Sequence, residues 1–328
     1  MRYATVGTGW IVDSFIRGAG QAGGLRLEAV YSRDRARGEA FALGHGGAAV
    51  FTDLEELAAY DGIDGVYIAS PNALHAPQAR LFLEHGKHVL CEKPLAVTAG
   101  QIRELTALAR EKGVLYLEAI MLLYQPALER LRAALTQIGN ITTARFDFSQ
   151  LSSKYPAYQR GETPNIFNPA LATGCLMDLG IYCVYPALEL FGRPREIHTS
   201  AGFLTTGADG YFDSLFLYDD KQVHLSGSKV GQGLLGSEIL GDRGTIAIGL
   251  ISQLTNIRLV AGGREEILAG EEPKEVLMGR EAAAFARYAA APGQYAAEIR
   301  HAQELAAAVA ETMELMRRQA GIRFQEDG

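Results

Sequence analysis

The architecture follows from one stretch near the start of the chain, Tyr3-Ala4-Thr5-Val6-Gly7-Thr8-Gly9-Trp10-Ile11-Val12. Its first four residues form a short, largely apolar run that predicts a strand. A helical pattern begins after Gly9. Two glycines between a strand and a helix let the chain turn tightly, so that backbone N–H groups and the helix N-terminus face a pyrophosphate. We therefore predict a dinucleotide-binding turn, in which Val12 stands where the G-x-G-x-x-G/A pattern has its third small residue.

Short apolar runs alternate with helical patterns from this turn to about residue 120. The predicted strands are Tyr3–Val6, Leu27–Tyr31, Gly65–Ala69, His88–Cys91 and Val114–Glu118. The predicted helices are Asp13–Ala19, Arg35–Leu43, Leu54–Ala58, Pro77–His85 and Ala99–Lys112. Strict alternation of strands and helices predicts βαβ units, and hence a doubly wound parallel sheet with helices on both faces.

The pattern then changes to longer segments in which apolar and polar residues alternate, joined by short turns. These segments are Thr143–Gln150, Ile197–Phe203, Ser214–Tyr218, Gln222–Lys229, Glu238–Leu240, Thr245–Ile248, Asn256–Val260 and Glu265–Ala269. Helical patterns occupy Pro126–Leu135, Leu176–Phe191 and Glu298–Gln319. Consecutive strands with short connections predict a mostly antiparallel sheet.

The expected fold class is therefore α/β, with an N-terminal Rossmann domain over residues 1–120 and a C-terminal α+β domain over residues 121–328 that carries a large, mostly antiparallel sheet. The last helix either stays with the second domain or packs back on the first. We expect the second domain to bind substrate and to form a homodimer or homotetramer through its sheet, if the face left uncovered by helices is apolar.

Composition excludes several classes of function. The 328 residues are 48% hydrophobic and 21% charged with a net charge of −7, and no basic run is available to neutralise nucleic-acid phosphates. We find no secretory signal pattern and no apolar stretch that we expect to span a membrane. Three cysteines without a C-x-x-C pair or zinc-like histidine spacing predict buried, reduced thiols, no metal site and a cytoplasmic protein.

The end of the second predicted strand bears on the choice of cofactor. It reads Val30-Tyr31-Ser32-Arg33-Asp34. An acidic residue at this tip holds the ribose 2′-hydroxyl of NAD, whereas an arginine suits the 2′-phosphate of NADP. Because Ser32 and Arg33 occupy the tip, we favour NADP over NAD. The alternative is that Arg33 is a solvated surface residue.

Three further motifs carry a family resemblance. Ala69-Ser70-Pro71-Asn72-Ala73-Leu74-His75 and Val89-Leu90-Cys91-Glu92-Lys93-Pro94 follow two consecutive predicted strands, and Thr173-Gly174-Cys175-Leu176-Met177-Asp178-Leu179-Gly180-Ile181-Tyr182 lies in the second domain. With the Rossmann start, these motifs resemble the glucose–fructose oxidoreductase/inositol dehydrogenase (Gfo/Idh/MocA) family. Tyr182 makes the third motif resemble the dihydrodiol dehydrogenase and glucose–fructose oxidoreductase branch more than the inositol dehydrogenases.

The chain also departs from the family pattern at several positions. Thr173 stands where a glycine is usual, and Tyr185 stands where the family often has Asp or Asn. The stretch Glu118–Tyr124 resembles a family segment but lacks its Trp and Arg. These departures put the substrate of the nearest branch in doubt, while the fold is unaffected.

Lys93, Asp178 and Tyr182 are the predicted catalytic residues, by chemistry and by resemblance. Asp178 and Tyr182 are four residues apart and share a helix face, and Lys93 follows a parallel strand, where such sheets bind ligands. A free tyrosine has a pKa of about 10, and a nearby ammonium lowers it towards the range of a base. Asp178 would keep Lys93 charged or orient a substrate hydroxyl. Alternatively, Tyr182 is a core aromatic residue and Asp178 a helix-start residue favoured by the helix dipole.

The predicted cofactor site gathers the residues that follow the parallel strands. They are Gly7, Thr8, Gly9, Trp10, Ile11, Ser32, Arg33, Ser70, Pro71, Asn72, His75, Glu92 and Lys93. Pro71 and Asn72 are expected on the nicotinamide side, His75 as a structural or ribose-neighbouring residue, and Glu92 as a support for Lys93 or its turn. Residues 151–172 form an irregular stretch that is either a cover over the site, with Lys154 and Asn168 as hydroxyl contacts, or a subunit contact.

The function expected from these residues is an NAD(P)-dependent dehydrogenase or reductase acting on CH–OH groups. It would transfer a hydride between nicotinamide and a sugar, polyol or related hydroxy or carbonyl compound, with Tyr182 as acid/base and Lys93 lowering its pKa. Two alternatives stay open: a non-catalytic NAD(P)-binding regulator, which has no need of Lys93, Asp178 and Tyr182 together, and a redox-assisted glycoside-cleaving enzyme.

Overall fold

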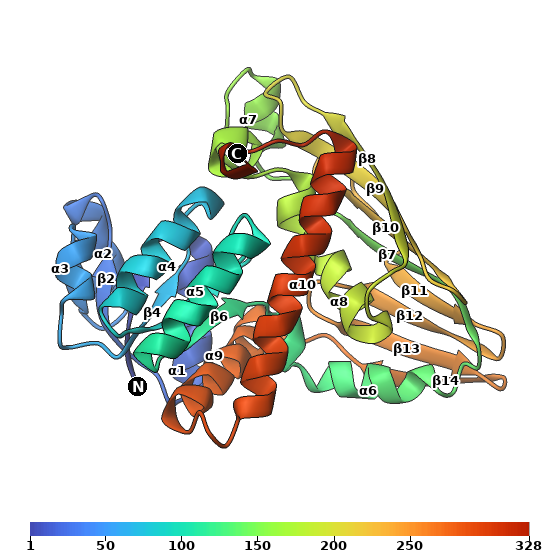
Figure 1. The fold of residues 1–328 in the computed structure, drawn as a ribbon, viewed down its shortest axis with the longest axis horizontal. Coiled ribbons are helices and arrows are strands. Elements are labelled where there is room, and N and C mark those ends of the chain that lie inside the picture. The colour runs from blue at the N-terminus through green and yellow to red at the C-terminus, as the bar shows by residue number, and fades with distance from the viewer. Residues whose placement is uncertain (328) are drawn as a thin grey trace. The chain divides into compact units, whose positions relative to one another are not determined.

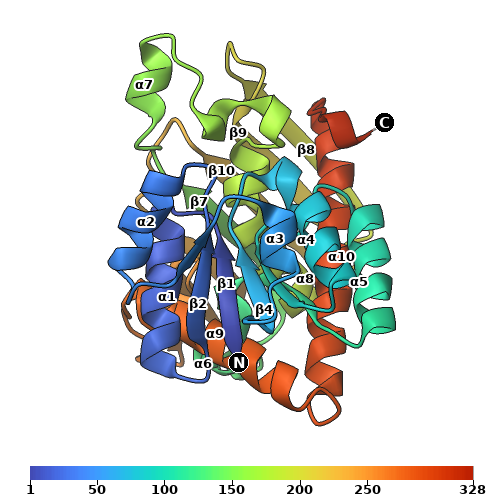
Figure 2. The ribbon, with the colours of Figure 1, turned by 90° about the vertical axis from the view of Figure 1, so that its left-hand side faces the viewer.

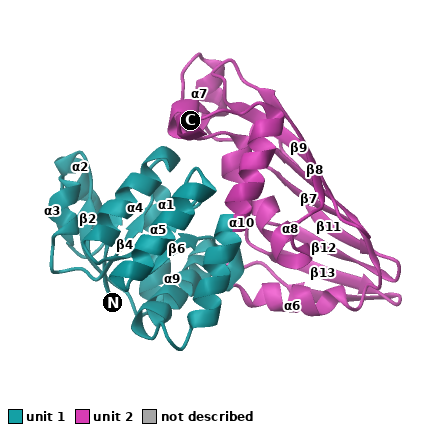
Figure 3. Ribbon diagram, in the orientation of Figure 1, with its two compact units in different colours: residues 1–124, 273–307 teal, residues 125–272, 308–328 magenta. Residues whose placement is uncertain are grey.

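A computed structural model describes residues 1–327 of the chain (Figure 1). The chain divides into two compact units (Figure 3). Unit 1 consists of Met1–Tyr124 and Pro273–Ala307, and unit 2 of Gln125–Glu272 and the residues from Ala308 onward. Each unit has its own sheet and its own buried core.

Unit 1 is built on a six-stranded sheet in the order β3-β2-β1-β4-β5-β6, with every neighbouring pair parallel. Its strands are β1 (Arg2–Val6), β2 (Arg26–Tyr31), β3 (Ala49–Phe51), β4 (Gly65–Ile68), β5 (His88–Glu92) and β6 (Tyr116–Ala119). The predicted Rossmann sheet is confirmed. Sequence analysis did not predict β3, because three residues are too few to show a period.

Helices cover both faces of this sheet, as Figure 2 shows. On one side lie α1 (Trp10–Ala22) and α2 (Arg35–Leu43), and on the other α3 (Leu54–Ala58), α4 (His75–Glu84) and α5 (Ala99–Lys112). The Thr98 side chain caps α5 by accepting a hydrogen bond from the Gln101 N–H, and the Gln101 side chain accepts one from the Thr98 N–H. This helix therefore begins where the sequence predicts.

The division of the chain differs from the expected one at residue 120. Unit 1 runs to Tyr124 and also takes Pro273–Ala307, which form α9 (Lys274–Ala290) and the first part of α10 (Ala296–Ala320). Sequence analysis did not predict α9, and it left open whether the last helix packs back on the first domain. Two glycines explain the placement of α9 on α1: a Cβ on Gly279 would lie 2.7 Å from the Gly18 carbonyl oxygen. Backbone contact of this kind needs both glycines and cannot be recognised from one helix alone.

Unit 2 is built on an eight-stranded sheet in the order β14-β13-β12-β11-β7-β10-β9-β8, in which all pairs are antiparallel except β7 with β10. The strands are β7 (Ile141–Ser149), β8 (Glu196–Phe203), β9 (Asp209–Leu217), β10 (Gln222–Ser228), β11 (Ser237–Gly241), β12 (Gly244–Leu250), β13 (Thr255–Ala261) and β14 (Arg264–Ala269). The expected large, mostly antiparallel sheet is confirmed.

One face of this sheet carries the core of unit 2, where Phe146, Phe212 and Leu225 are buried. Helix α8 (Ile181–Phe191) packs against this face, and α6 (Pro126–Leu135) contacts β13 and β14. Residues Pro169–Phe191 are long and apolar enough to cross a membrane, which corrects our expectation that no stretch would be. Because 89% of its most apolar 18-residue window is buried within the described structure, it has the environment of a core helix.

Candidate active site

The carboxyl ends of β1, β2, β4 and β5 share one edge of the unit 1 sheet, and every predicted cofactor residue lies on or after one of these ends. The strand order reverses between β1 and β4, because β2 and β3 continue on one side and β5 and β6 on the other. Sheets of this type bind dinucleotides in the crevice at such a reversal. The edge of unit 1 therefore has the topology that a nicotinamide dinucleotide needs.

The turn after β1 is shaped by its glycines. Gly7 has a φ of +118°, and a Cβ there would lie 3.0 Å from the Ala69 carbonyl oxygen, so the turn needs glycine. A Cβ on Gly9 would meet no atom within 4 Å, which leaves the N-terminus of α1 open to a ligand. Val12 is fully buried and packs beside Gly7. A larger residue in the third position is thus accommodated without blocking the turn.

The tip of β2 presents one arginine. Ser32 is buried, whereas Arg33 is exposed. Asp34 caps α2, its carboxylate accepting a 3.1 Å hydrogen bond from the Arg37 backbone N–H. Because the Asp34 carboxylate caps the helix, it is not directed to a ribose hydroxyl. The exposed guanidinium of Arg33 is the group at this tip that suits a phosphate.

A set of hydrogen bonds holds the turn that carries Lys93. Tyr67 donates to the Glu92 carboxylate, and the Leu95 N–H donates to Glu118 over 2.8 Å. Tyr116 donates from its hydroxyl to the Leu95 carbonyl over 3.0 Å. The Lys93–Pro94 peptide bond is cis. Lys93 is therefore fixed at the edge where the cofactor residues lie, with Glu92 supporting the turn.

His75 joins the two loops that follow β4 and β5. Its Nδ1 lies 2.7 Å from the Pro94 carbonyl oxygen and its Nε2 lies 2.8 Å from the Ser70 carbonyl oxygen. The side chain is only 1% exposed, and burial lowers the pKa of the imidazole although both carbonyls oppose that shift. Both ring nitrogens face backbone carbonyls, and a neutral imidazole donates to one of them. These contacts support a structural role for His75, which stays a prediction.

Two buried carboxylates that sequence analysis gave no role lie near Glu92. They belong to Glu118 on β6 and Glu281 on α9. Burial raises the pKa of Glu281 well above its ordinary value, and the charges of Glu92 and Glu118 raise it further. Lys274, at the start of α9, opposes the shift, and its Nζ lies 4.3 Å from the centre of the exposed Trp10 ring. Lys274 therefore places a positive charge beside the first turn of α1.

In unit 2, Asp178 and Tyr182 lie on one continuous helical segment. The expected helix Leu176–Phe191 is confirmed in extent, but its first turn, Leu176–Gly180, is a π-helix that continues into α8. Single π-turns inside helices recur at functional sites. Tyr182 is 8% exposed, and its ring packs edge-on against Phe148 at 5.5 Å.

The start of this segment is anchored by a buried aspartate that sequence analysis missed. Asp209 begins β9, and its Oδ2 accepts a 2.6 Å hydrogen bond from the Leu176 N–H. Gly174 lies against it so closely that a Cβ there would overlap the carboxylate, which accounts for the glycine in the motif. Within residues 1–327, Asp209 Oδ1 has no hydrogen-bond partner, and burial raises the pKa of Asp209 to about 6.

Asp178 has a partner that the sequence did not reveal. The ammonium of Lys229, the residue after β10, donates to Asp178 Oδ2. We expected Asp178 to serve Lys93 or the substrate, and that role stays a prediction. The signal for Lys229 was weak, because a single lysine at the end of an alternating strand normally reads as a solvated residue.

The comparisons with known proteins add the family. A model of an oxidoreductase family with an NAD-binding Rossmann fold matches residues 1–119, and the GFO/IDH/MocA C-terminal domain matches residues 129–247. The scyllo-inositol 2-dehydrogenase (NADP(+)) IolU of Bacillus subtilis is 40% identical over 278 residues, which are 84% of this chain and 85% of the relative. The chain belongs to the Gfo/Idh/MocA oxidoreductase family. It is accordingly an NAD(P)-binding oxidoreductase.

Relatives within the Gfo/Idh/MocA family act on different compounds. The trans-1,2-dihydrobenzene-1,2-diol dehydrogenase of Mus musculus is 34% identical over 224 residues, which are 66% of this chain and 65% of that one. The relatives therefore include both an inositol dehydrogenase and dihydrodiol dehydrogenases, the second being a branch that the Tyr182 motif resembles.

Solved structures of other reductases share the fold. KijD10, a 3-ketoreductase from Actinomadura kijaniata solved with NADP and TDP-benzene, superposes with a TM-score of 0.85 at 20% identity and covers 98% of both chains. Biliverdin reductase from Synechocystis gives a TM-score of 0.78 at 22% identity and covers 98% of this chain and 99% of that one. These structures support the same two-domain architecture.

The stretch that precedes the Gfo/Idh/MocA helix motif is partly helical, with α7 (Tyr155–Gln159) and short turns at Asn165–Phe167 and Pro169–Leu171. Lys154 is exposed, while the Asn168 side chain accepts from the Ala170 N–H. Thr173, which replaces the usual family glycine, places its hydroxyl 2.7 Å from the Asn165 carbonyl oxygen. The departure at Thr173 therefore ties this stretch to the helix that carries Asp178.

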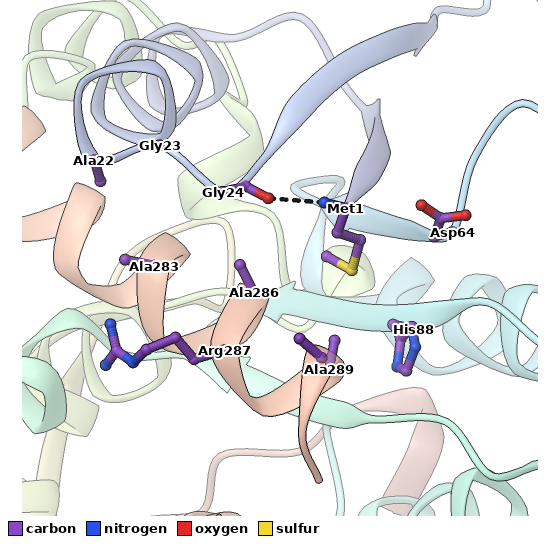
Figure 4. A pocket seen from close by; sticks show the side chains of 11 residues that line it. Met1, Ala22, Gly23, Gly24, Asp64, His88, Ala283, Ala286, Arg287 and Ala289 are labelled. Atoms are coloured by element: carbon purple, nitrogen blue, oxygen red, sulfur yellow. Dashed lines mark hydrogen bonds between the residues drawn. The ribbon is translucent and has the colours of Figure 1, made fainter.

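A hollow of about 780 Å³ in unit 1 lies away from these residues (Figure 4). It is lined by Met1, Gly24, Asp64, His88 and residues of α9, and the chain's amino group donates to the Gly24 carbonyl at its rim. Asp64 and His88 precede β4 and begin β5, so the hollow lies at the amino ends of the parallel strands. Ligands of such sheets bind at the other edge, and we exclude this hollow as the active site.

The buried Asp209 predicts a pH-dependent stability. Its pKa rises from 3.8 to about 6 on folding, so the native state binds the extra proton and unfolding becomes easier as pH rises through about 6. Asp209→Asn keeps an acceptor for the Leu176 N–H but has no carboxyl group to titrate. We expect its free energy of unfolding to fall by about 1 kcal/mol less than that of wild type between pH 5 and pH 8. Urea denaturation at several pH values measures this difference.

Asp219→Asn is the matched control, because Asp219 lies beyond the other end of β9 with its side chain 92% exposed. It should leave the wild-type pH dependence unchanged. An equal pH dependence in wild type and Asp209→Asn would contradict the assignment.

Proposed function

We propose that this protein is an NADP-dependent dehydrogenase or reductase that acts on CH–OH groups of a sugar, polyol or related compound, with Tyr182 as acid/base and Lys93 lowering its pKa. The observation that carries the proposal is the fixed turn of Lys93, held through Glu92, Pro94 and Leu95 at the dinucleotide-binding edge. A lysine that only faces solvent would not need neighbours fixed by so many hydrogen bonds. The NADP-dependent inositol dehydrogenase among the relatives supports the same class of reaction.

The residues of the edge fit a nicotinamide dinucleotide, since Gly9 leaves the N-terminus of α1 without a side chain in the way. When bound, the nicotinamide supplies or accepts the hydride. The chain's own residues would manage the proton. In reduction, the Tyr182 phenol donates a proton to the carbonyl oxygen, and in oxidation the phenolate takes it back.

Lys93 and Asp178 would make that proton transfer possible near neutral pH. The Lys93 ammonium favours the phenolate form of Tyr182 and donates a hydrogen bond to the substrate oxygen. Asp178 would accept a hydrogen bond from a substrate hydroxyl and so orient the carbon that reacts. Glu92 supports the turn of Lys93 and need not touch the substrate.

We further propose that the protein works in the cytoplasm as a homodimer or homotetramer formed by unit 2. The sheet face opposite α8 carries polar side chains such as Arg145, Asp147 and Ser226, around a groove of about 730 Å³, so this part of the face is not the apolar surface on which we based the expectation. Leu234 and Leu235 project from the same groove, 90% and 99% exposed. Two fully exposed leucines beside a sheet face favour a covered surface over a free one.

The catalytic proposal predicts the effect of removing one hydroxyl. Tyr182→Phe should keep the affinity for NADPH and lower kcat by about 10²- to 10⁴-fold, the usual contribution of a general acid/base. Steady-state kinetics on the best substrate from a panel of cyclitols, aldoses and ketoses measures it, with NADPH affinity by fluorescence titration.

Tyr218→Phe serves as the control, because Tyr218 packs on Phe191 at the far end of α8 and donates to the Gly192 carbonyl. Its kcat should stay within about twofold of wild type. Full activity of Tyr182→Phe would refute the role of Tyr182. Tight NADPH binding without turnover of any compound in the panel would favour the regulator.

The cofactor proposal predicts a selective loss. Arg33→Ala should weaken NADPH binding about tenfold or more and leave NADH binding unchanged, because only NADPH carries the 2′-phosphate that an arginine fork holds. Arg26→Ala is the control, since Arg26 is exposed at the opposite end of the same strand. Equal loss for both cofactors, or none for either, would contradict the role of Arg33.

A further inference from the structure

We propose that Lys229 is a positioning residue of the active site, whose ammonium holds the Asp178 carboxylate in one orientation. The inference rests on the proposed function and adds a residue to it. No motif of the sequence includes Lys229, which lies 51 residues beyond Asp178 and reaches it only through the fold.

The backbone of Lys229 is fixed on both sides. Its N–H donates to the Gly210 carbonyl over 2.8 Å, which joins it to β9. Its carbonyl accepts from the Ser152 N–H over 2.9 Å, at the start of the irregular stretch 151–172 that precedes the helical segment of Asp178. Lys229 therefore lies where the sheet, this stretch and the helix of Asp178 come together in unit 2.

Burial decides which member of the pair acts on the other. The Lys229 side chain is 5% exposed, whereas that of Asp178 is 28% exposed. A buried ammonium needs an acceptor, and Lys229 donates to Asp178 Oδ2. Asp178 is thus the member that solvent or substrate can reach, and Lys229 lies behind it.

A second carboxylate strengthens the argument. Asp209 is buried in the same region, and the positive charge of Lys229 lowers its pKa against the larger effect of burial. With Lys229 present, the local charge of these three groups is −1 when both carboxylates are ionised. Without Lys229, two carboxylates would share one poorly hydrated region, and Asp178 would lose the donor that orients its carboxylate.

The consequence for the reaction passes through Asp178. Asp178 precedes Tyr182 by four residues on the same helical segment, so a change in its orientation changes the substrate carbon presented to the phenol. Lys229 need not touch the substrate. It determines the position of a residue that we propose does.

Lys229→Met tests this inference, because methionine keeps the length and packing of the side chain and removes the charge. We expect kcat/KM for the best panel substrate to fall about 10- to 100-fold, the usual result of misplacing a reacting group, with unchanged NADPH affinity. Lys229→Arg, which keeps the charge, should stay within about tenfold of wild type. Lys221→Met is the control: Lys221 pairs with Asp220 at the other end of β10 and should have wild-type kinetics.

A double-mutant cycle separates positioning from a general loss of structure. In an Asp178→Asn background, Lys229→Met should lower kcat/KM by no more than about threefold further, because its effect passes through the Asp178 carboxylate. Equal losses in both backgrounds, or wild-type kinetics of Lys229→Met, would overturn the inference.

Tyr182→Phe measured in the same series distinguishes the two failures. If Tyr182→Phe is inactive and Lys229→Met is fully active, the inference alone fails. If Tyr182→Phe is fully active, or no panel compound is turned over, the proposed function fails and the inference with it.

Discussion

The contacts of His75 with two carbonyl groups are the constraint on which the cofactor edge depends. They join the loop after β4 to the loop after β5, and so fix the Pro94 turn relative to Ser70. Because His75 is buried, water does not compete for these contacts. Lys93 thereby occupies a set position among the backbone groups that we propose bind the dinucleotide. A charged side chain whose place is set before substrate arrives costs little reorganisation during the reaction.

Unit 2 uses the same principle with buried charges. Asp209 fixes the start of the helical segment, and Lys229 fixes Asp178 two residues further along. Buried ionised groups are costly unless each has partners, so such groups accumulate where position matters more than stability. The π-turn Leu176–Gly180, which contains both contacted residues, is consistent with a site where position matters, since such turns recur at functional sites.

The sequence predicts those parts of the molecule that depend on neighbouring residues. Local sequence patterns predict the Gly7 turn, the Lys93 turn and both sheets. The placement of α9 could not be predicted, since it depends on contact between Gly18 and Gly279, which are 261 positions apart in the chain. Asp209 and Lys229 escaped for the same reason, because only the folded sheet brings β9 and β10 to the helix that carries Asp178. Contacts between a helix and residues on distant strands leave no periodic signal in the sequence.

The central claim is that Lys93 lowers the pKa of Tyr182, and a phenolate titration tests it most directly. The ultraviolet difference between wild type and Tyr182→Phe isolates the absorbance of one phenol as pH rises in the presence of NADP. The account predicts a midpoint below the ordinary value of about 10, moving up by at least about one unit in Lys93→Met. A midpoint at or above 10 in wild type, or one that Lys93→Met leaves in place, would contradict it.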